Sequence, residues 1–190
     1  MTTPISRFPV VELTTLPDDL REYVETVAEK TGFVPNVFLA LAHRPDELRA
    51  FIGMHDALML KDSAALSKAD REMIVVATSA ANDCLYCVVA HGAVLRIRRR
   101  SGLIADQVAT NYRKADLTDR ERAMLDFAVK VATASAGVSD FDFQTLRAEG
   151  FTEDDIWDIG SIAALFAYSN RMANFASMMP NEEFYDMGRG

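Results

Sequence analysis

Four helix-start signals constrain what this chain can fold into. Each is a serine or threonine followed three positions later by a carboxylate: Ser67 with Asp70, Thr118 with Glu121, Ser139 with Asp142, and Thr152 with Asp155. In this pattern, the capping box, each side chain accepts a hydrogen bond from the backbone N–H of the other residue at the start of a helix. Apolar residues recur at helical spacing, and no segment shows the sustained alternation of a half-buried strand. The chain is therefore predicted to be all-α.

Proline and glycine divide the chain further. Residues 1–16 are expected to form an extended N-terminal arm, and residues 17–185 a single domain whose core motif region is 66–100. Helices are expected from about Pro17 to Lys30, Asn36 to Ala42, Pro45 to Leu60, Cys84 to Arg100, and Thr152 to Met178. For the helix from Cys84 to Arg100, Asn82 and Asp83 are the expected N-terminal caps, and Ser101-Gly102 is expected to end the helix. The run Met73 to Ala81 is apolar on nearly every face, which is typical of a helix buried in a core.

Charge excludes some classes of function. The 190 residues include 28 acidic and 20 basic side chains, a net charge of −8, which argues against nucleic acid or an anionic membrane as the main partner. The basic run Arg96 to Arg100 is short, and these cations are expected to lie against the negative end of a helix. No stretch reaches the roughly 18 apolar residues of a membrane span, and the first residues do not resemble a signal peptide. A cytoplasmic protein is expected.

The two cysteines of the chain lie three residues apart and share a helix with a histidine. Cys84, Cys87 and His91 stand at i, i+3 and i+7, so they lie on one face. Two cysteines are too few for a secreted disulfide framework and fit a reducing compartment. Cys84 is expected in the first turn, where the helix dipole favours a thiolate, and Cys87 is expected to need His91 as its base. The pattern predicts a redox-active dithiol.

A carboxylate in the preceding helix extends this group. Glu72 has Val76, Ser79 and Ala80 on its own face, so a charge facing the core there needs a partner. If the two helices pack as an antiparallel pair, Glu72 approaches His91, giving a carboxylate, imidazole and thiol relay.

Simpler interpretations exist for each residue. Glu72 can be a solvated partner of the helix dipole, His91 a core histidine, and the cysteines small core residues. The coincidence of both cysteines and one of only three histidines on one face favours redox chemistry. A zinc site is disfavoured because there is no second ligand pair, and a thioredoxin-like protein because there is no βαβ pattern. His43 and His55 are interpreted as structural, and Trp157 as either core or an oligomer contact.

The motif resembles that of the AhpD-like alkylhydroperoxidases of the carboxymuconolactone decarboxylase superfamily. Their pattern, a Glu, eleven residues, Cys, two residues, Cys, three residues and His, is matched here by Glu72, Cys84, Cys87 and His91. The flanking segments Gly32-Phe-Val-Pro-Asn, Leu117-Thr-Asp-Arg-Glu-Arg-Ala and Gly150-Phe-Thr-Glu-Asp-Asp-Ile resemble the longer, peroxidase-related branch. The resemblance covers roughly residues 8–185. It implies a multi-helical orthogonal bundle of packed helical hairpins that assembles as a dimer, trimer or hexamer.

The same resemblance implies the roles of the residues. Cys87 would be the peroxidatic thiol, activated by His91 and Glu72, and Cys84 would resolve its sulfenic acid by forming the Cys84–Cys87 disulfide. No bound cofactor or metal is implied. The reductant would be an external thiol, such as a lipoylated or thioredoxin-like protein. One position departs from the best understood relatives: Tyr86 replaces a histidine between the cysteines, and it is a possible accessory residue that is a poor base at neutral pH.

Three functions are therefore compatible with the sequence. The first is an oxidoreductase, a thiol peroxidase that reduces organic hydroperoxides or hydrogen peroxide as an antioxidant enzyme. The second is a cofactor-free decarboxylase or isomerase of a lactone, which would not need the dithiol. The third is a non-enzymatic redox sensor or partner-binding module whose disulfide changes its oligomeric state.

Overall fold

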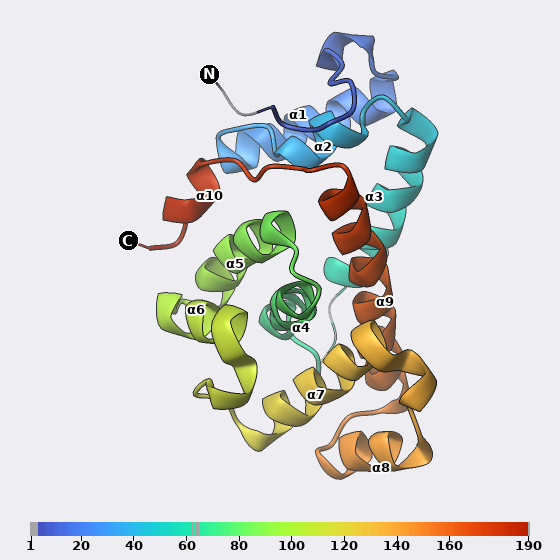
Figure 1. Cartoon of the computed structure of the whole chain (residues 1–190), viewed down its shortest axis with the longest axis vertical. Helices are drawn as coiled ribbons and strands as arrows, with labels where there is room; N and C mark the ends of the chain where they lie inside the picture. The colour runs from blue at the N-terminus through green and yellow to red at the C-terminus, as the bar shows by residue number, and fades with distance from the viewer. Residues whose placement is uncertain (1–3, 62, 64, 190) are drawn as a thin grey trace.

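The computed structural model describes residues 4–61, 63 and 65–189, and within these ranges the chain is helical with no strand (Figure 1). The all-α prediction is confirmed. The helices are α1 (Asp18–Thr31), α2 (Asn36–Leu41), α3 (Pro45–Met59), α4 (Lys68–Ala81), α5 (Leu85–Arg99), α6 (Gly102–Asn111), α7 (Asp119–Ala134), α8 (Asp140–Ala148), α9 (Glu153–Phe175) and α10 (Glu183–Asp186). Short 3₁₀ turns occupy Leu13–Thr15, Tyr112–Lys114 and Ser135–Gly137.

The four predicted capping boxes all form, at the starts of α4, α7, α8 and α9. At α4, the Asp70 carboxylate accepts the Ser67 N–H at 2.9 Å, and the Ser67 hydroxyl accepts the Asp70 N–H at 3.1 Å. Each cap satisfies backbone donors that would otherwise have no partner, which stabilises a helix by about 1 kcal/mol. The predicted stop at Gly32 is also present, with a left-handed φ of 86° that favours glycine.

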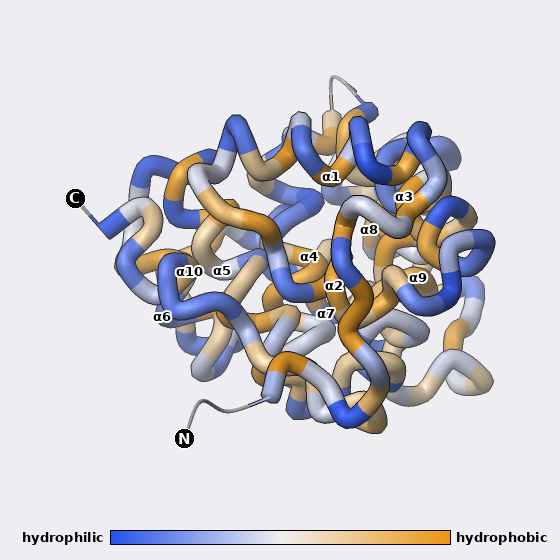
Figure 2. Tube along the Cα trace, turned by 90° about the horizontal axis from the view of Figure 1, so that it is seen from above, coloured by the Kyte–Doolittle hydropathy of each residue, from blue (hydrophilic) through white to orange (hydrophobic). Residues whose placement is uncertain are grey.

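Helix α4 lies at the centre of the molecule, where it contacts α5, α6, α7 and α9 (Figure 1). Met73, Ile74, Val75 and Val76 are completely buried in consecutive positions, as expected for a helix that is apolar on every face. The largest hydrophobic cluster joins α4 to α7 and α9, and a second cluster joins α1, α2 and α3. Figure 2 shows hydrophobic stretches passing through the interior and hydrophilic stretches on the periphery.

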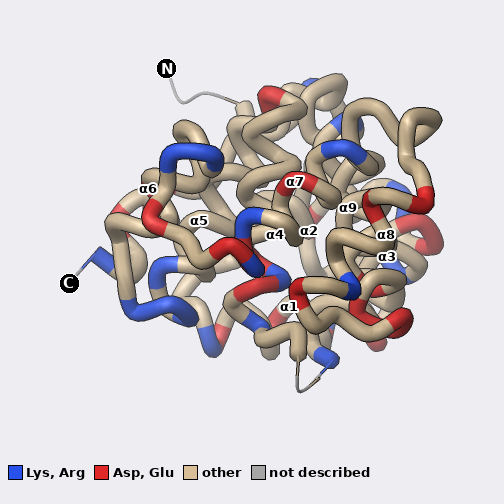
Figure 3. The backbone as a smooth tube through the Cα atoms, turned by 90° about the horizontal axis from the view of Figure 1, so that it is seen from below, with Lys and Arg blue, Asp and Glu red and all other residues tan. Residues whose placement is uncertain are grey.

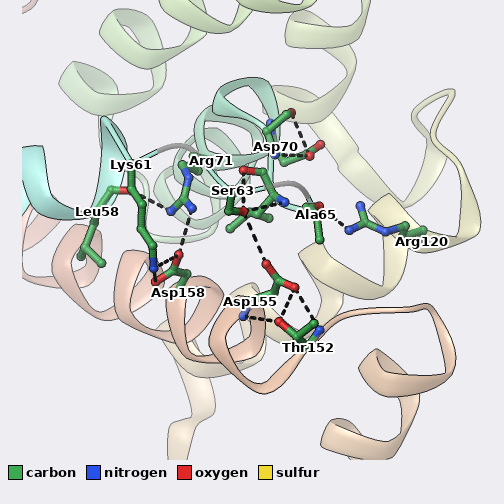
Figure 4. A network of polar contacts seen from close by, with 12 residues as sticks. Leu58, Lys61, Ser63, Ala65, Asp70, Arg71, Arg120, Thr152, Asp155 and Asp158 are labelled. Atoms are coloured by element: carbon green, nitrogen blue, oxygen red, sulfur yellow. Dashed lines mark hydrogen bonds and ion pairs between the residues drawn. The ribbon is translucent and has the colours of Figure 1, made fainter.

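A buried ion pair attaches α4 to α9 (Figure 4). Arg71 is fully buried, and its guanidinium donates to Asp158 at 2.9 Å and to the Leu58 carbonyl at 2.7 Å. Lys61 reaches the same Asp158 carboxylate at 3.0 Å. Because Arg71 precedes Glu72 in the chain, this network also restrains the turn of α4 that carries Glu72.

Several predicted boundaries are wrong. Cys84 itself is the N-cap of α5, so neither Asn82 nor Asp83 caps that helix. Ser101 accepts the Ile104 N–H and opens α6, a helix that the sequence did not predict. Helix α9 ends at Phe175, before the predicted Met178, because the chain turns through a left-handed conformation at Ser177.

The two ends of the chain are bonded to other elements of the fold. The N-terminal arm includes an unpredicted 3₁₀ turn, and it pairs with the segment after α9 through Arg7 N–H to the Ala176 carbonyl. Helix α10 was also not predicted. Residues 1–3 of the expected arm lie outside the described residues.

The arginines in the last turn of α5 lie at the negative end of the helix, as predicted, and they also have specific partners. Arg96 is buried and donates to the carbonyls of Phe184 at 2.6 Å and Met187 at 2.8 Å, which holds the C-terminal segment on α5. Arg99 pairs with Glu121 at 2.7 Å. Figure 3 shows basic segments lying next to acidic ones in several places. In the described part of the chain, no helix is long and apolar enough to cross a membrane.

Candidate active site

Helices α4 and α5 bring Glu72 and His91 together. Their packing places the first turns of α4 beside the middle and end of α5, as an antiparallel pair requires, and Glu72 Oε2 lies 2.8 Å from His91 Nδ1. Glu72 is only 3% exposed, so its interpretation as a solvated partner of the helix dipole is wrong. The Arg98 guanidinium of α5 lies 3.5 Å from its other oxygen. A buried carboxylate within hydrogen-bond distance of a histidine is suited to stabilise that ring when it takes up a proton.

The second ring nitrogen of His91 faces away from this carboxylate. Because Nδ1 is bound to Glu72, Nε2 is the nitrogen that is available for proton transfer. The edge-to-face contact of His91 with Phe166, at 4.7 Å between ring centroids, restricts the orientation of the imidazole. Together, Glu72 and Phe166 hold His91 in one position at the edge of the core.

Cys84 replaces the usual hydroxyl or carboxylate at the N-cap of α5. Its backbone is extended, and its sulfur accepts the Cys87 N–H at a distance of 3.4 Å. The predicted place in the first turn is thus off by one position, but the expected environment is the same: unpaired N–H groups and the positive end of the helix dipole favour a thiolate. Both cysteines are buried, and both thiols are free.

The two thiols titrate as a pair. The hydrogen bond from the Cys87 thiol, reinforced by the Cys87 N–H, lowers the pKa of Cys84 to about 7. The same contact with the Cys84 sulfur, together with burial, raises the pKa of Cys87 well above its usual range. The pair therefore loses one proton near neutral pH and holds the second one, so that one negative charge is shared between two sulfur atoms.

A small cavity of about 70 Å³ opens between Cys87 and His91. Its walls come from α1, α2, α3, α5 and α9, and the residues that line it are Tyr23, Val37, Phe38, Phe51, Ile52, His55, Tyr86, Cys87, His91 and Ser169. Cys87 is among them and Cys84 is not, so Cys87 is the cysteine that lines the cavity. Among the described residues, no hydrogen bond joins His91 to either sulfur. A proton that moves between Cys87 and His91 would therefore have to cross the cavity that both residues line.

Tyr86 connects the site to α2. Its hydroxyl accepts the Val37 N–H at 3.0 Å, and its side chain is 5% exposed. Burial raises the pKa of Tyr86 above its usual range, so the phenol stays protonated at neutral pH. Tyr86 thus lines the cavity as a neutral group, which agrees with the expectation that it is not a base.

Residues far away in sequence complete the site, and the sequence analysis missed them. Ser169 of α9 lies 3.8 Å from the Cys87 sulfur through its hydroxyl, and the completely buried Asn170 bonds Ser79 and Asn82. His55, interpreted from sequence as structural, lies at the cavity with its ring centroid 6.4 Å from that of His91. No spacing or motif links these residues to the cysteine pair, so only the tertiary structure reveals them.

Two other sequence-based expectations have a plain structural outcome. His43 binds the Ala40 carbonyl and stacks on Phe8, away from the cavity. Trp157 is 76% exposed, so it does not belong to the core.

No group of three or more His, Cys, Asp or Glu side chains in the described ranges is placed to hold a metal ion. The catalytic roles of Glu72, Cys84, Cys87 and His91 stay predictions.

Comparisons with known proteins agree on one family. A sequence model of the carboxymuconolactone decarboxylase family matches residues 45–109, which include the cysteine pair, Glu72 and His91. The solved structure of an uncharacterized peroxidase-related protein from Ralstonia eutropha JMP134, described as an alkylhydroperoxidase AhpD core, is 63% identical, has a TM-score of 0.97, and covers 100% of this chain and 99% of its own. A second peroxidase-related protein, from Silicibacter sp. TM1040, is 42% identical with a TM-score of 0.92, over 100% of both chains.

A more distant similarity concerns the fold alone. The debrominase Bmp8 is 19% identical with a TM-score of 0.79, over 99% of this chain and 97% of Bmp8. No match is found among the curated proteins. Because one fold can support different reactions, the chemistry has to be argued from the side chains of the site.

Proposed function

The chain belongs to the carboxymuconolactone decarboxylase family as an AhpD-like member, and on that basis we propose that it is a thiol peroxidase that reduces hydroperoxides with the Cys84–Cys87 pair. One observation carries the proposal. The Glu72 carboxylate holds His91 at 2.8 Å, and His91 lines the same small cavity as the Cys87 sulfur. This arrangement supports the roles of Cys87 as nucleophile, His91 as base, and Glu72, which contacts His91, as the residue that orients the base.

The first step oxidises Cys87. Its thiolate attacks the outer oxygen of the hydroperoxide, an S–O bond forms, and the O–O bond breaks. Cys87 becomes a sulfenic acid, and the second oxygen leaves as an alcohol, or as water from hydrogen peroxide, after taking up the proton released by the thiol. Cys87 takes this role because it faces the cavity, whereas Cys84 does not.

The proton of Cys87 has two acceptors within the site. With one negative charge on the pair, transfer of the proton to the Cys84 sulfur places the thiolate on the side of the cavity. Alternatively, His91 takes the proton through a molecule bound in the cavity, and Glu72 stabilises the imidazolium that forms. His91 then returns the proton to the leaving oxygen.

The second step forms the disulfide. The Cys84 sulfur attacks the sulfur of the Cys87 sulfenic acid, an S–S bond forms, and the hydroxyl takes a proton from solvent and leaves as water. Restoring the dithiol requires two electrons from an external thiol, for which we propose a lipoylated or thioredoxin-like protein. We further propose that the enzyme works in the cytoplasm as a homo-oligomer without a bound cofactor.

The proposal is tested by trapping the intermediate. Reduced Cys84→Ser, treated with one equivalent of hydrogen peroxide or cumene hydroperoxide, is expected to gain one oxygen at Cys87, detected by intact mass and by reaction with dimedone. The wild-type protein is expected to lose two hydrogens instead and form the Cys84–Cys87 disulfide. Cys87→Ser is the matched control, in which neither product forms at an enzymatic rate.

Two results would redirect the function. Lactone decarboxylation or isomerisation that survives the double change Cys84→Ser plus Cys87→Ser would favour the cofactor-free enzyme. A disulfide-dependent change in oligomeric size, measured by light scattering in the absence of peroxide turnover, would favour the redox sensor. Either result without oxidation at Cys87 overturns the peroxidase.

A further inference from the structure

We propose that His55 is a second polar group of the substrate cavity, a neutral imidazole that accepts a hydrogen bond from the O–H of the bound hydroperoxide and directs its outer oxygen toward Cys87. His55 comes from α3, on a different element from Cys87 and His91, yet all three line the same cavity. This inference rests on the proposed peroxidase function and adds to it a positioning residue and a requirement for a substrate with an O–H group.

The contacts of His55 determine which nitrogen can meet a ligand. Its Nδ1 lies 2.9 Å from the Asp56 carboxylate, and the Tyr23 hydroxyl donates to the same carboxylate oxygen at 2.9 Å. A carboxylate at Nδ1 keeps a proton on that nitrogen, so Nε2 of the neutral ring carries a lone pair. No residue in the described part of the chain bonds Nε2, which leaves this acceptor available to a molecule in the cavity.

The charges around His55 keep the ring neutral. Burial lowers the pKa of His55 from its usual value, and a charge on His91 across the cavity lowers it further. Asp56 on α3 and Glu72 on α4 act in the opposite direction but do not reverse the shift. At neutral pH the ring therefore accepts a hydrogen bond, and in the proposed mechanism the acid–base group is the other imidazole, His91, which is held by Glu72.

The dimensions of the cavity suit this arrangement. Its volume of about 70 Å³ is far below the 300–1,000 Å³ of typical ligand pockets and holds only a few water-sized molecules. Two imidazoles whose ring centroids are 6.4 Å apart face this space, with the Cys87 sulfur at its wall. A peroxide group placed here meets one imidazole as a hydrogen-bond acceptor and the other as an acid–base group.

The experiment compares two variants of His55 with a control histidine. His55→Phe keeps a ring but removes the acceptor, whereas His55→Gln keeps an amide oxygen that can accept a hydrogen bond. The matched control is His43→Phe, which changes a histidine that does not line the cavity. The rate of disulfide formation in the reduced protein is measured by quenched flow against hydrogen peroxide concentration, after circular dichroism has shown that each variant is folded.

The expected result is a loss of affinity with a signature in the pH profile. Loss of one hydrogen bond predicts that the peroxide concentration at half-maximal rate rises about 10-fold in His55→Phe, with partial recovery in His55→Gln and no change in His43→Phe. In the wild-type protein, protonation of His55 contributes to the fall of the rate on the acid side. In both His55 variants this contribution of His55 is expected to be absent.

Each outcome decides one claim. If the wild-type protein forms the disulfide rapidly and folded His55→Phe has the same half-saturating concentration and pH profile, the role of His55 is refuted and the peroxidase stands. If the wild-type protein does not react, the peroxidase fails, and the inference fails with it. A merely structural role of His55 would lower the stability of the variants without changing the acid side of the pH profile.

Discussion

Replacement of Glu72 by glutamine tests whether the buried carboxylate contributes to the chemistry. Glu72→Gln keeps the size and shape of the side chain and removes its negative charge, 2.8 Å from His91 Nδ1. A hydrogen bond between charged groups contributes about 1.5–3 kcal/mol, and because Glu72 is only 3% exposed, water does not replace the lost interaction. If this energy stabilises the imidazolium in the transition state, the rate constant for oxidation of Cys87 falls about 10- to 100-fold, at 1.36 kcal/mol per factor of ten.

The assay is quenched flow of the reduced protein with hydrogen peroxide, followed by alkylation and mass spectrometry of the cysteine pair. Glu121→Gln is the matched control, because Glu121 is also a buried carboxylate, but its charged partner is Arg99 at 2.7 Å and not His91. Glu121→Gln is expected to lower stability and leave the rate unchanged. A folded Glu72→Gln protein whose rate stays within twofold of wild type would refute the reasoning.

Two further predictions concern the thiols and the core. The absorbance of the reduced protein at 240 nm is expected to show one thiolate appearing as the pH rises through about 7, because the contact with Cys87 lowers the pKa of Cys84 to about 7. The second thiolate is expected only at much higher pH. In Cys84→Ser the step near pH 7 is expected to disappear, and its persistence would contradict the assignment of this step to Cys84. Asp158→Asn is expected to lower the free energy of unfolding, measured in urea, by about 3–5 kcal/mol, because it leaves the buried Arg71 without its ion pair. A loss below about 1 kcal/mol would show that the ion pair contributes little to stability.

The sequence predicts the helices well because their start signals are local. A capping box such as Ser67 with Asp70 brings its own hydrogen-bond partners within four residues, so the helix start depends little on the rest of the fold. The same local logic finds the pair of cysteines and His91. Predicted helix boundaries are wrong where more than one neighbouring residue can cap the helix. At the start of α5, the Cys84 sulfur is the cap in place of the neighbouring Asn82 or Asp83.

The rest of the site depends on contacts between distant elements. His55, Ser169 and Asn170 reach the cysteines only because α3 and α9 pack beside α4 and α5. Nothing in the spacing of these residues distinguishes them from ordinary core residues. The partners of the buried Arg96 could not be predicted for the same reason, because they are backbone carbonyls of a C-terminal segment whose position does not follow from a local pattern.

The rate at which hydrogen peroxide converts the reduced wild-type protein to the Cys84–Cys87 disulfide tests the central claim most directly. A peptide containing residues 82–91 is the reference, because it has both thiols and His91 but lacks Glu72, the cavity and the folded helix terminus. General acid–base catalysis contributes typically 10²- to 10⁴-fold, so the protein is expected to react at least about 100-fold faster than the peptide. Equal rates in protein and peptide would contradict the account.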